Sequence, residues 1–256
     1  MADKPRLGVF KFSSCDGCQL TLLDCEDEVL AVANAVEIAY FPEATRRDDV
    51  GTYDIALVEG SVTTPHEAEL IKDIRARSKA LIAIGACATS GGIQALKNGA
   101  DTNAFINAVY AHPEFIHTLD TATPISDHVT VDFELRGCPI SKAHLLELIA
   151  ATLAGRAPQT PPHSTCIDCK MAGNVCVMVA EGKPCLGPVT HSGCGALCPS
   201  FARGCYGCFG PKETPHTGPL AKRLAENGAS PRDIQRLFST FNTNAPAFRE
   251  EAKNHE

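Results

Sequence analysis

Eight of the thirteen cysteines in this 256-residue chain lie between Cys166 and Cys208, and no other feature restricts the fold as strongly. Eight thiolates suffice for two sites of four sulfur ligands, and the pair Cys198-Pro199 is typical of ferredoxin motifs. The rest of this stretch is rich in Gly and Pro with few long apolar runs, so it cannot build much hydrophobic core and would need metal to hold its shape. Electron transfer through iron–sulfur clusters is therefore the leading hypothesis.

A segment dense in cysteine could also hold disulfide bonds or zinc instead of iron–sulfur clusters. A disulfide framework is disfavoured, because thirteen is odd and no export signal precedes the first apolar segment. We expect a cytoplasmic protein, and cytoplasmic thiols stay reduced and bind metal more often than they pair. A zinc-stabilised binding module is the alternative from another class of protein, since paired C-x2-C spacings also suit tetrahedral zinc.

The charge and the hydropathy of the chain exclude other partners. A formal net charge of −7 argues against nucleic acid, whose binders usually carry a basic face. The chain has no run of 18 apolar residues, so we expect no membrane span.

The first part of the chain alternates between short apolar runs and amphipathic stretches. The expected strands are residues 6–12, 36–41, 55–58, 80–84 and 129–135, and the expected helices are residues 19–33, 67–78 and 141–153. Fully apolar strands that alternate with helices are typical of an α/β fold, in which helices cover both faces of a parallel sheet.

A connector rich in Pro and Thr at residues 157–165 predicts a domain boundary. We expect an α/β domain in residues 1–156. Residues 157–256 would form a small irregular domain with a helical tail after Gly218.

Four of the five remaining cysteines follow predicted strands. Cys15 and Cys18 lie after the first strand, Cys87 after the fourth and Cys138 after the fifth. Because the carboxyl ends of parallel strands meet at one edge of a sheet, these four thiolates can form one metal site. Taken singly, Cys87 or Cys138 could equally be a small buried hydrophobic residue.

Other residues near this edge have less certain roles. Gly17, Gly85 and Gly137 would let the backbone approach a bulky cluster closely. Glu59 ends the third strand, where it could carry protons beside a cluster or be an ordinary solvated carboxylate. We expect Cys25 to lie inside the first helix as a structural residue.

Five motifs together resemble the small, electron-transferring subunit of nickel–iron ([NiFe]) hydrogenases. They are SCDGCQ at residues 14–19, EGSV at 59–62, GACA at 85–88, RGCP at 136–139 and CLGP at 185–188. The chain is most similar to the cytoplasmic sulfhydrogenase delta subunit type. Coenzyme-F420-linked and viologen-reducing hydrogenases are close neighbours, and the cluster-bearing subunit of respiratory quinone reductases would match the N-terminal domain alone.

The resemblance implies a flavodoxin-like domain followed by a ferredoxin-like domain, with three [4Fe-4S] clusters. The proximal set of ligands would be Cys15, Cys18, Cys87 and Cys138; the distal set Cys166, Cys169, Cys176 and Cys185; and the medial set Cys194, Cys198, Cys205 and Cys208. Exported relatives place histidine where Cys166 stands and proline where Cys198 stands. His163 is then a linker histidine. An exchange of the fourth cysteine between the two C-terminal clusters is an alternative division of the eight.

The resemblance also implies the partners. A [NiFe] hydrogenase large subunit would activate hydrogen, and flavin- and iron–sulfur-containing NAD(P)-linked subunits would exchange the electrons. The chain has neither nickel-binding thiolate pairs nor a Gly-rich dinucleotide motif, so we expect no catalytic residues and no hydrogenase activity without partners.

Overall fold

The computed structural model describes residues 4–46 and 51–256. A parallel sheet of five strands forms the centre of the N-terminal part, in the order β2-β1-β3-β4-β5. The strands are β1 (Arg6–Lys11), β2 (Glu37–Tyr40), β3 (Tyr53–Glu59), β4 (Ser78–Ile84) and β5 (Phe133–Leu135). This is the flavodoxin-type strand order, so the predicted α/β class and flavodoxin-like sheet are confirmed.

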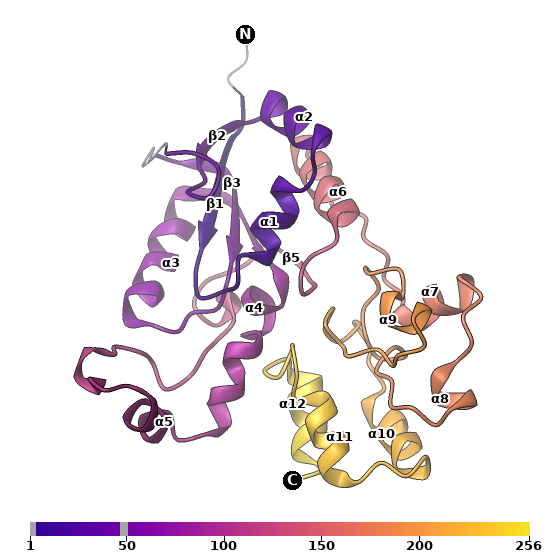
Figure 1. Cartoon of the computed structure of the whole chain (residues 1–256). Coiled ribbons are helices and arrows are strands. Elements are labelled where there is room, and N and C mark those ends of the chain that lie inside the picture. Colours follow the sequence, from indigo (N-terminus) through magenta and orange to yellow (C-terminus); the bar gives the residue numbers. More distant parts are fainter. Residues whose placement is uncertain (1–3, 47–50) are drawn as a thin grey trace.

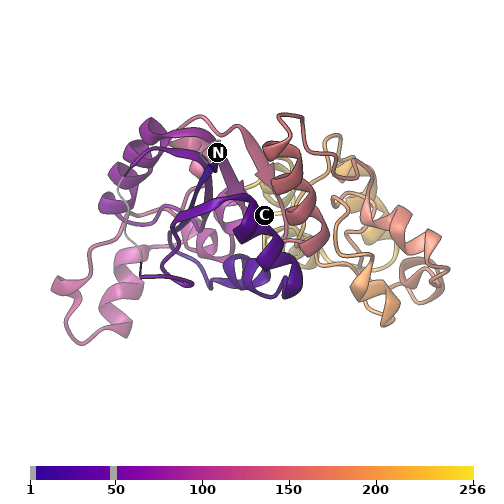
Figure 2. The same ribbon diagram turned by 90° about the horizontal axis from the view of Figure 1, so that it is seen from above.

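Helices cover both faces of the sheet, as Figures 1 and 2 show. One face packs on α1 (Gly17–Leu23), α2 (Asp27–Ala35) and α6 (Lys142–Leu153). The other face packs on α3 (Pro65–Arg77). Alternate residues of each central strand serve the two faces: Leu57 lies in the first core, and Ala56 and Val58 lie in the second.

The structure differs from the sequence prediction at two elements. The helix expected over residues 19–33 is two helices, because the chain turns at Glu26, whose φ is 50°. The fifth strand is shorter than expected and begins at Phe133. Just before it, the backbone N–H of Asp132 donates to the carbonyl of Leu81 at 2.9 Å, but the N–H of Leu81 donates to the side chain of Asp132, at 2.7 Å, and not to a backbone carbonyl. Asp132 also forms an ion pair with Arg75 on α3.

The connection between β4 and β5 is long and carries several short elements. They are α4 (Gly85–Ser90), α5 (Thr102–Val109) and the 3₁₀ helices η1 (Ile93–Gly99), η2 (Pro113–Phe115) and η3 (Ile125–Asp127). Figure 1 shows α5 projecting from the sheet, away from the C-terminal part of the chain.

The C-terminal part consists of loops and helices. The helices are α7 (Thr165–Met171), α8 (Val177–Ala180), α9 (Leu197–Ser200), α10 (Thr217–Glu226), α11 (Pro231–Phe238) and α12 (Pro246–Lys253). The last three helices bury a core of their own, and Leu186 and Val189 from the cysteine-rich stretch join it. This part therefore has more apolar support than expected. The domain boundary at residue 157 stays a prediction.

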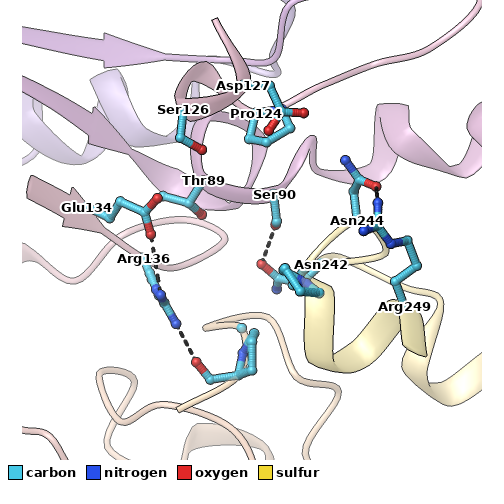
Figure 3. A pocket seen from close by; sticks show the side chains of 14 residues that line it. Thr89, Ser90, Pro124, Ser126, Asp127, Glu134, Arg136, Asn242, Asn244 and Arg249 are labelled. Atoms are coloured by element: carbon cyan, nitrogen blue, oxygen red, sulfur yellow. Dashed lines mark hydrogen bonds and ion pairs between the residues drawn. The ribbon is translucent and has the colours of Figure 1, made fainter. Parts of the chain in front are cut away.

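Two side chains connect the N-terminal and C-terminal parts, as Figure 3 shows. Ser90, at the end of α4, donates a hydrogen bond to Oδ1 of the buried Asn242 at 2.6 Å, and Asn242 Nδ2 donates to the carbonyl of Gly207 at 2.8 Å. Arg136 donates to the carbonyl of Pro211. These bonds hold the edge of the sheet against the cysteine-rich loops.

Candidate metal centres

The four cysteines of the proximal set lie together at the carboxyl edge of the sheet. Cys18 is buried in the first turn of α1, and Cys87 is in α4, directly after β4. Burial raises the pKa of the Cys87 thiol to about 11, and the neighbouring charges of Cys138 and Cys15 add to this effect. Burial likewise raises the pKa of Cys18, with contributions from Glu59, Cys87 and Cys138. Metal binding at these positions would therefore release protons from the thiols.

Glycines make room for these sulfur atoms. A Cβ on Gly85, whose φ is 85°, would overlap Sγ of Cys18. A Cβ on Gly92, whose φ is 62°, would lie 2.6 Å from Sγ of Cys87. Gly17, Gly85 and Gly137 were predicted for this role; Gly92, four residues beyond the GACA motif, was not. A Cβ on Gly137 would meet Pro139, Ile140 and Phe209 instead of a sulfur atom. The backbone therefore approaches the sulfur atoms where side chains would block a cluster.

Glu59 stabilises the loop that carries Cys18. Its side chain is only 2% exposed, so the hypothesis of a solvated carboxylate is wrong. Its two carboxylate oxygens accept hydrogen bonds from the backbone N–H groups of Cys18, at 3.0 Å, and Gln19, at 3.1 Å. These donors belong to the first turn of α1, where intrahelical acceptors are lacking. Glu59 thus acts as an N-cap from a distant strand; its role as a proton carrier stays a prediction.

Gln94 is a neighbour of the proximal set that sequence reasoning missed. Its Oε1 lies 3.4 Å from Sγ of Cys87, and its Nε2 donates to the carbonyl of Ser13 at 2.8 Å. The residue lies on η1, and its spacing from Cys87 has no recognisable signal. Gln94 connects the loop after β1 to the loop after β4, and both loops carry cysteines.

The four cysteines of the distal set line one cavity in the C-terminal part, together with Val177, Met178 and Pro199. Burial raises the pKa of Cys185, and the neighbouring charges of Cys176 and Cys169 contribute. The donor set and the apolar wall both suit an iron–sulfur cluster.

The side chain of His163 pairs with a carboxylate. Its Nε2 lies 2.6 Å from Oδ1 of Asp168, which also accepts a hydrogen bond from Ser192 at its other oxygen. This pairing agrees with the expectation that His163 belongs to the linker.

The medial set lies between the other two. Burial raises the pKa values of Cys205 and Cys208 to about 12, and the charges of Cys194 and Cys198 contribute at Cys208. Cys208 also neighbours Cys138 of the proximal set. The N–H of Cys205 donates a hydrogen bond to Sγ of Cys185 in the distal set at 3.2 Å. The three groups of cysteines are therefore arranged in the order proximal, medial, distal.

Among the described residues, no three side chains of His, Cys, Asp or Glu converge closely enough to bind one metal ion. The choice between iron–sulfur clusters and the zinc-stabilised module stays a prediction.

Cys25 lies in the turn between α1 and α2, and not inside a helix as expected. It is fully buried in the first core, where its Sγ donates a hydrogen bond to the carbonyl of Thr21 at 3.3 Å. This packing is that of a structural residue.

Comparison with known proteins supplies a family. The sequence model of the NADH ubiquinone oxidoreductase 20 Kd subunit matches residues 15–152, a range that contains the whole proximal set. The sulfhydrogenase 2 subunit delta of Pyrococcus furiosus is 38% identical over 206 residues, which cover 80% of this chain and 86% of that relative. The chain belongs to the small-subunit family of nickel–iron hydrogenases.

Solved hydrogenase structures share the fold of this small subunit. A chain of a NAD+-reducing [NiFe]-hydrogenase in the H2-reduced state is 30% identical, with a TM-score of 0.58, and the match covers 62% of this chain and 96% of that chain. An actinobacterial-type NiFe-hydrogenase from Ralstonia eutropha H16 is 17% identical, with a TM-score of 0.58, over 98% of this chain and 90% of that chain. The predicted family, which places the chain among subunits of oxidoreductases, is confirmed.

The membrane prediction can be compared with the helices of the structure. Across residues 4–46 and 51–256, no helix has both the length and the apolar character needed to cross a bilayer.

Proposed function

We propose that this hydrogenase small subunit transfers electrons between a [NiFe] large subunit and flavin- and iron–sulfur-containing NAD(P)-linked subunits in the cytoplasm. Three [4Fe-4S] clusters, when bound, supply the one-electron redox chemistry. The observation that carries the proposal is the spatial order of the cysteines, in which Cys208 adjoins Cys138 and the N–H of Cys205 bonds to Cys185. A chain of sites in this order suits electron transfer across the subunit.

The ligands are part of the proposal. We assign Cys15, Cys18, Cys87 and Cys138 to the proximal site, Cys166, Cys169, Cys176 and Cys185 to the distal site, and Cys194, Cys198, Cys205 and Cys208 to the medial site. The common cavity of the distal four supports their grouping. The charge of Cys194 acts on both Cys198 and Cys208, which supports the medial group. Two domains, residues 1–156 and 157–256, would hold one and two of these sites.

The partners and the location rest on similarity and on cysteine chemistry. The likeness to a chain of a NAD+-reducing hydrogenase supports an NAD(P)-linked partner. The high cysteine content supports a cytoplasmic location, because thiols stay reduced there and more often bind metal than pair.

Anaerobic purification of the tagged full chain with its bound partners tests the function. We expect a brown complex with about twelve irons per small subunit, on four per cluster. It should contain nickel in a second chain and reduce methyl viologen with hydrogen. A colourless preparation with stoichiometric zinc and no hydrogen-dependent reduction would overturn the proposal.

A further inference from the structure

The side chain of Phe209 is buried where the N-terminal and C-terminal parts of the chain meet. Phe209 is only 4% exposed, yet none of the apolar cores of the described residues includes it. A buried aromatic side chain usually packs into such a core, because burial of its large apolar area is a main source of stability. The position of Phe209 therefore needs another explanation.

The ring of Phe209 touches two glycines that come from different parts of the chain. A Cβ on Gly137 would lie 3.0 Å from the Cε1 atom of the ring, and a Cβ on Gly193 would lie 2.1 Å from the same atom. A side chain at Gly193 would therefore overlap the ring, and one at Gly137 would press against it. The ring is in close contact with both backbones, and glycine is the residue that allows such an approach.

All three residues of this contact are next to a proposed cluster ligand. The first glycine directly precedes Cys138 of the proximal set, the second directly precedes Cys194 of the medial set, and the phenylalanine directly follows Cys208 of the medial set. Burial raises the pKa of Cys208, and a hydrogen bond with the backbone of Cys138 opposes this rise. The ring therefore lies where the proximal and the medial cysteine loops meet.

Without the ring, this junction would be open to water. Arg136, which precedes Gly137, donates a hydrogen bond to the carbonyl of Pro211, two residues after Phe209. The segments that surround the ring are loops, whose backbone groups can also bond to water. Water enters a gap that is large enough and offers several polar partners, whereas a purely apolar gap stays dry. The ring of Phe209 occupies space that water would otherwise fill.

We propose that Phe209 is a positioning residue, which keeps the proximal and medial cysteine loops in register and excludes water from the space between them. This inference rests on the proposed function, because it assigns the ring a role toward two of the three clusters. Water favours the more highly charged state of a buried group, and a cluster held by four thiolates becomes more negative when it is reduced. A dry junction therefore keeps the reduction potential of the medial site lower than it would be beside water.

Phe209→Leu in the purified complex tests this role, because leucine is apolar but lacks the Cε1 atom that touches both glycines. We expect full iron content and a higher midpoint potential of the medial cluster, measured by redox titration with electron paramagnetic resonance. After exchange into D2O, new deuteron couplings to that cluster should report the entry of water. The distal cluster should keep its potential. Phe238→Leu is the matched control, because it truncates a fully buried ring in the core of the last three helices.

Gly193→Ala displaces the ring without removing it. The three atoms nearest to the added methyl group all belong to the ring of Phe209, so the ring has to move. We expect the same rise in the potential of the medial cluster and the same deuteron couplings. Gly195→Ala is the control on the other side of Cys194, since Gly195 has a φ of 60° and open space around it. The control variant should keep the unmodified potential.

Failure of this inference can be distinguished from failure of the proposed function. Unchanged potentials without new deuteron couplings in Phe209→Leu and Gly193→Ala would overturn the role of the ring. Equal changes in the Phe238→Leu control would also overturn it, because they would reflect a general loosening of the chain. Absence of any iron–sulfur signal from the unmodified complex would instead contradict the proposed function.

Discussion

Glu59 and Cys18 are 41 positions apart, and a carboxylate oxygen of Glu59 accepts the backbone N–H of Cys18 at 3.0 Å. The other oxygen accepts the N–H of Gln19. A buried side chain at the end of β3 therefore determines where the first turn of α1, and with it a proximal cysteine, lies. The carboxamide of Gln19 is also buried, and in the described part of the chain it has no hydrogen-bond partner.

Glu59→Gln should loosen the proximal loop. The side-chain amide of the variant would point its NH2 group at the backbone N–H of Cys18 or Gln19, and two donors cannot form a hydrogen bond. We therefore expect the free energy of unfolding to fall by about 1–3 kcal/mol. The paramagnetic signal of the reduced proximal cluster should also change shape. Asp233→Asn in the capping box of α11 is the control, because it also removes a capping carboxylate but lies on a helix without cysteines. An unchanged spectrum in the Glu59 variant would mean that Glu59 does not position the cluster.

Gly85→Ala should prevent assembly of the proximal cluster. The added Cβ would overlap Sγ of Cys18, and the backbone of Gly85 has a φ of 85°. We expect a loss of about four irons per chain, one cluster's worth, measured by iron analysis. Gly228→Ala is the control that separates backbone strain from the overlap with sulfur. Gly228 also has a positive φ, 96°, but the space around it is open. The Gly228 variant should lose about 1–2 kcal/mol of free energy of unfolding and should keep its full iron content. Full iron content in the Gly85 variant would contradict the proposed proximal site.

Cys198→Pro should convert the medial site to three irons. Cys198 is the second residue of α9, where a helix lacks an intrahelical acceptor for the N–H, so proline fits the backbone there. The expected result is a new paramagnetic signal in the oxidised protein and about one iron fewer per chain. An oxidised protein with no new signal would remove Cys198 from the ligand set.

Cys25→Ala should leave every cluster in place. The side chain is fully buried in the core between α1 and the sheet, so its truncation should cost about 1–2 kcal/mol of stability, measured by denaturant unfolding. Iron content and spectra should match those of the unmodified chain. Loss of iron would show that Cys25 has a role beyond packing.

Sequence reasoning was most successful where a local pattern and the topology agree. The apolar runs of β1, β3 and β4 fall where expected, since buried parallel strands have a distinctive composition. The gathering of Cys15, Cys18, Cys87 and Cys138 at one sheet edge follows from that topology. The turn at Glu26 was not predictable, because amphipathic periodicity continues through it and only the backbone shows the break.

Other features depend on contacts between distant segments. Gln94 approaches Cys87 only because η1 folds back over α4, and no motif signals this. The core of α10, α11 and α12 includes Leu186 and Val189 from a stretch whose composition predicted little apolar packing. Neither the buried position of Glu59 nor its two backbone donors follows from the sequence around it.

The bond between Ser90 and Asn242 has a kinetic consequence. Ser90 lies three residues after Cys87, and Asn242 in turn holds the carbonyl of Gly207, which directly precedes Cys208. The rate of electron tunnelling falls exponentially with distance, so even a small relative motion of the two parts of the chain would make that rate fluctuate widely. If electrons pass between these two sets of cysteines as proposed, the buried hydrogen bond between Ser90 and Asn242 would restrain this motion.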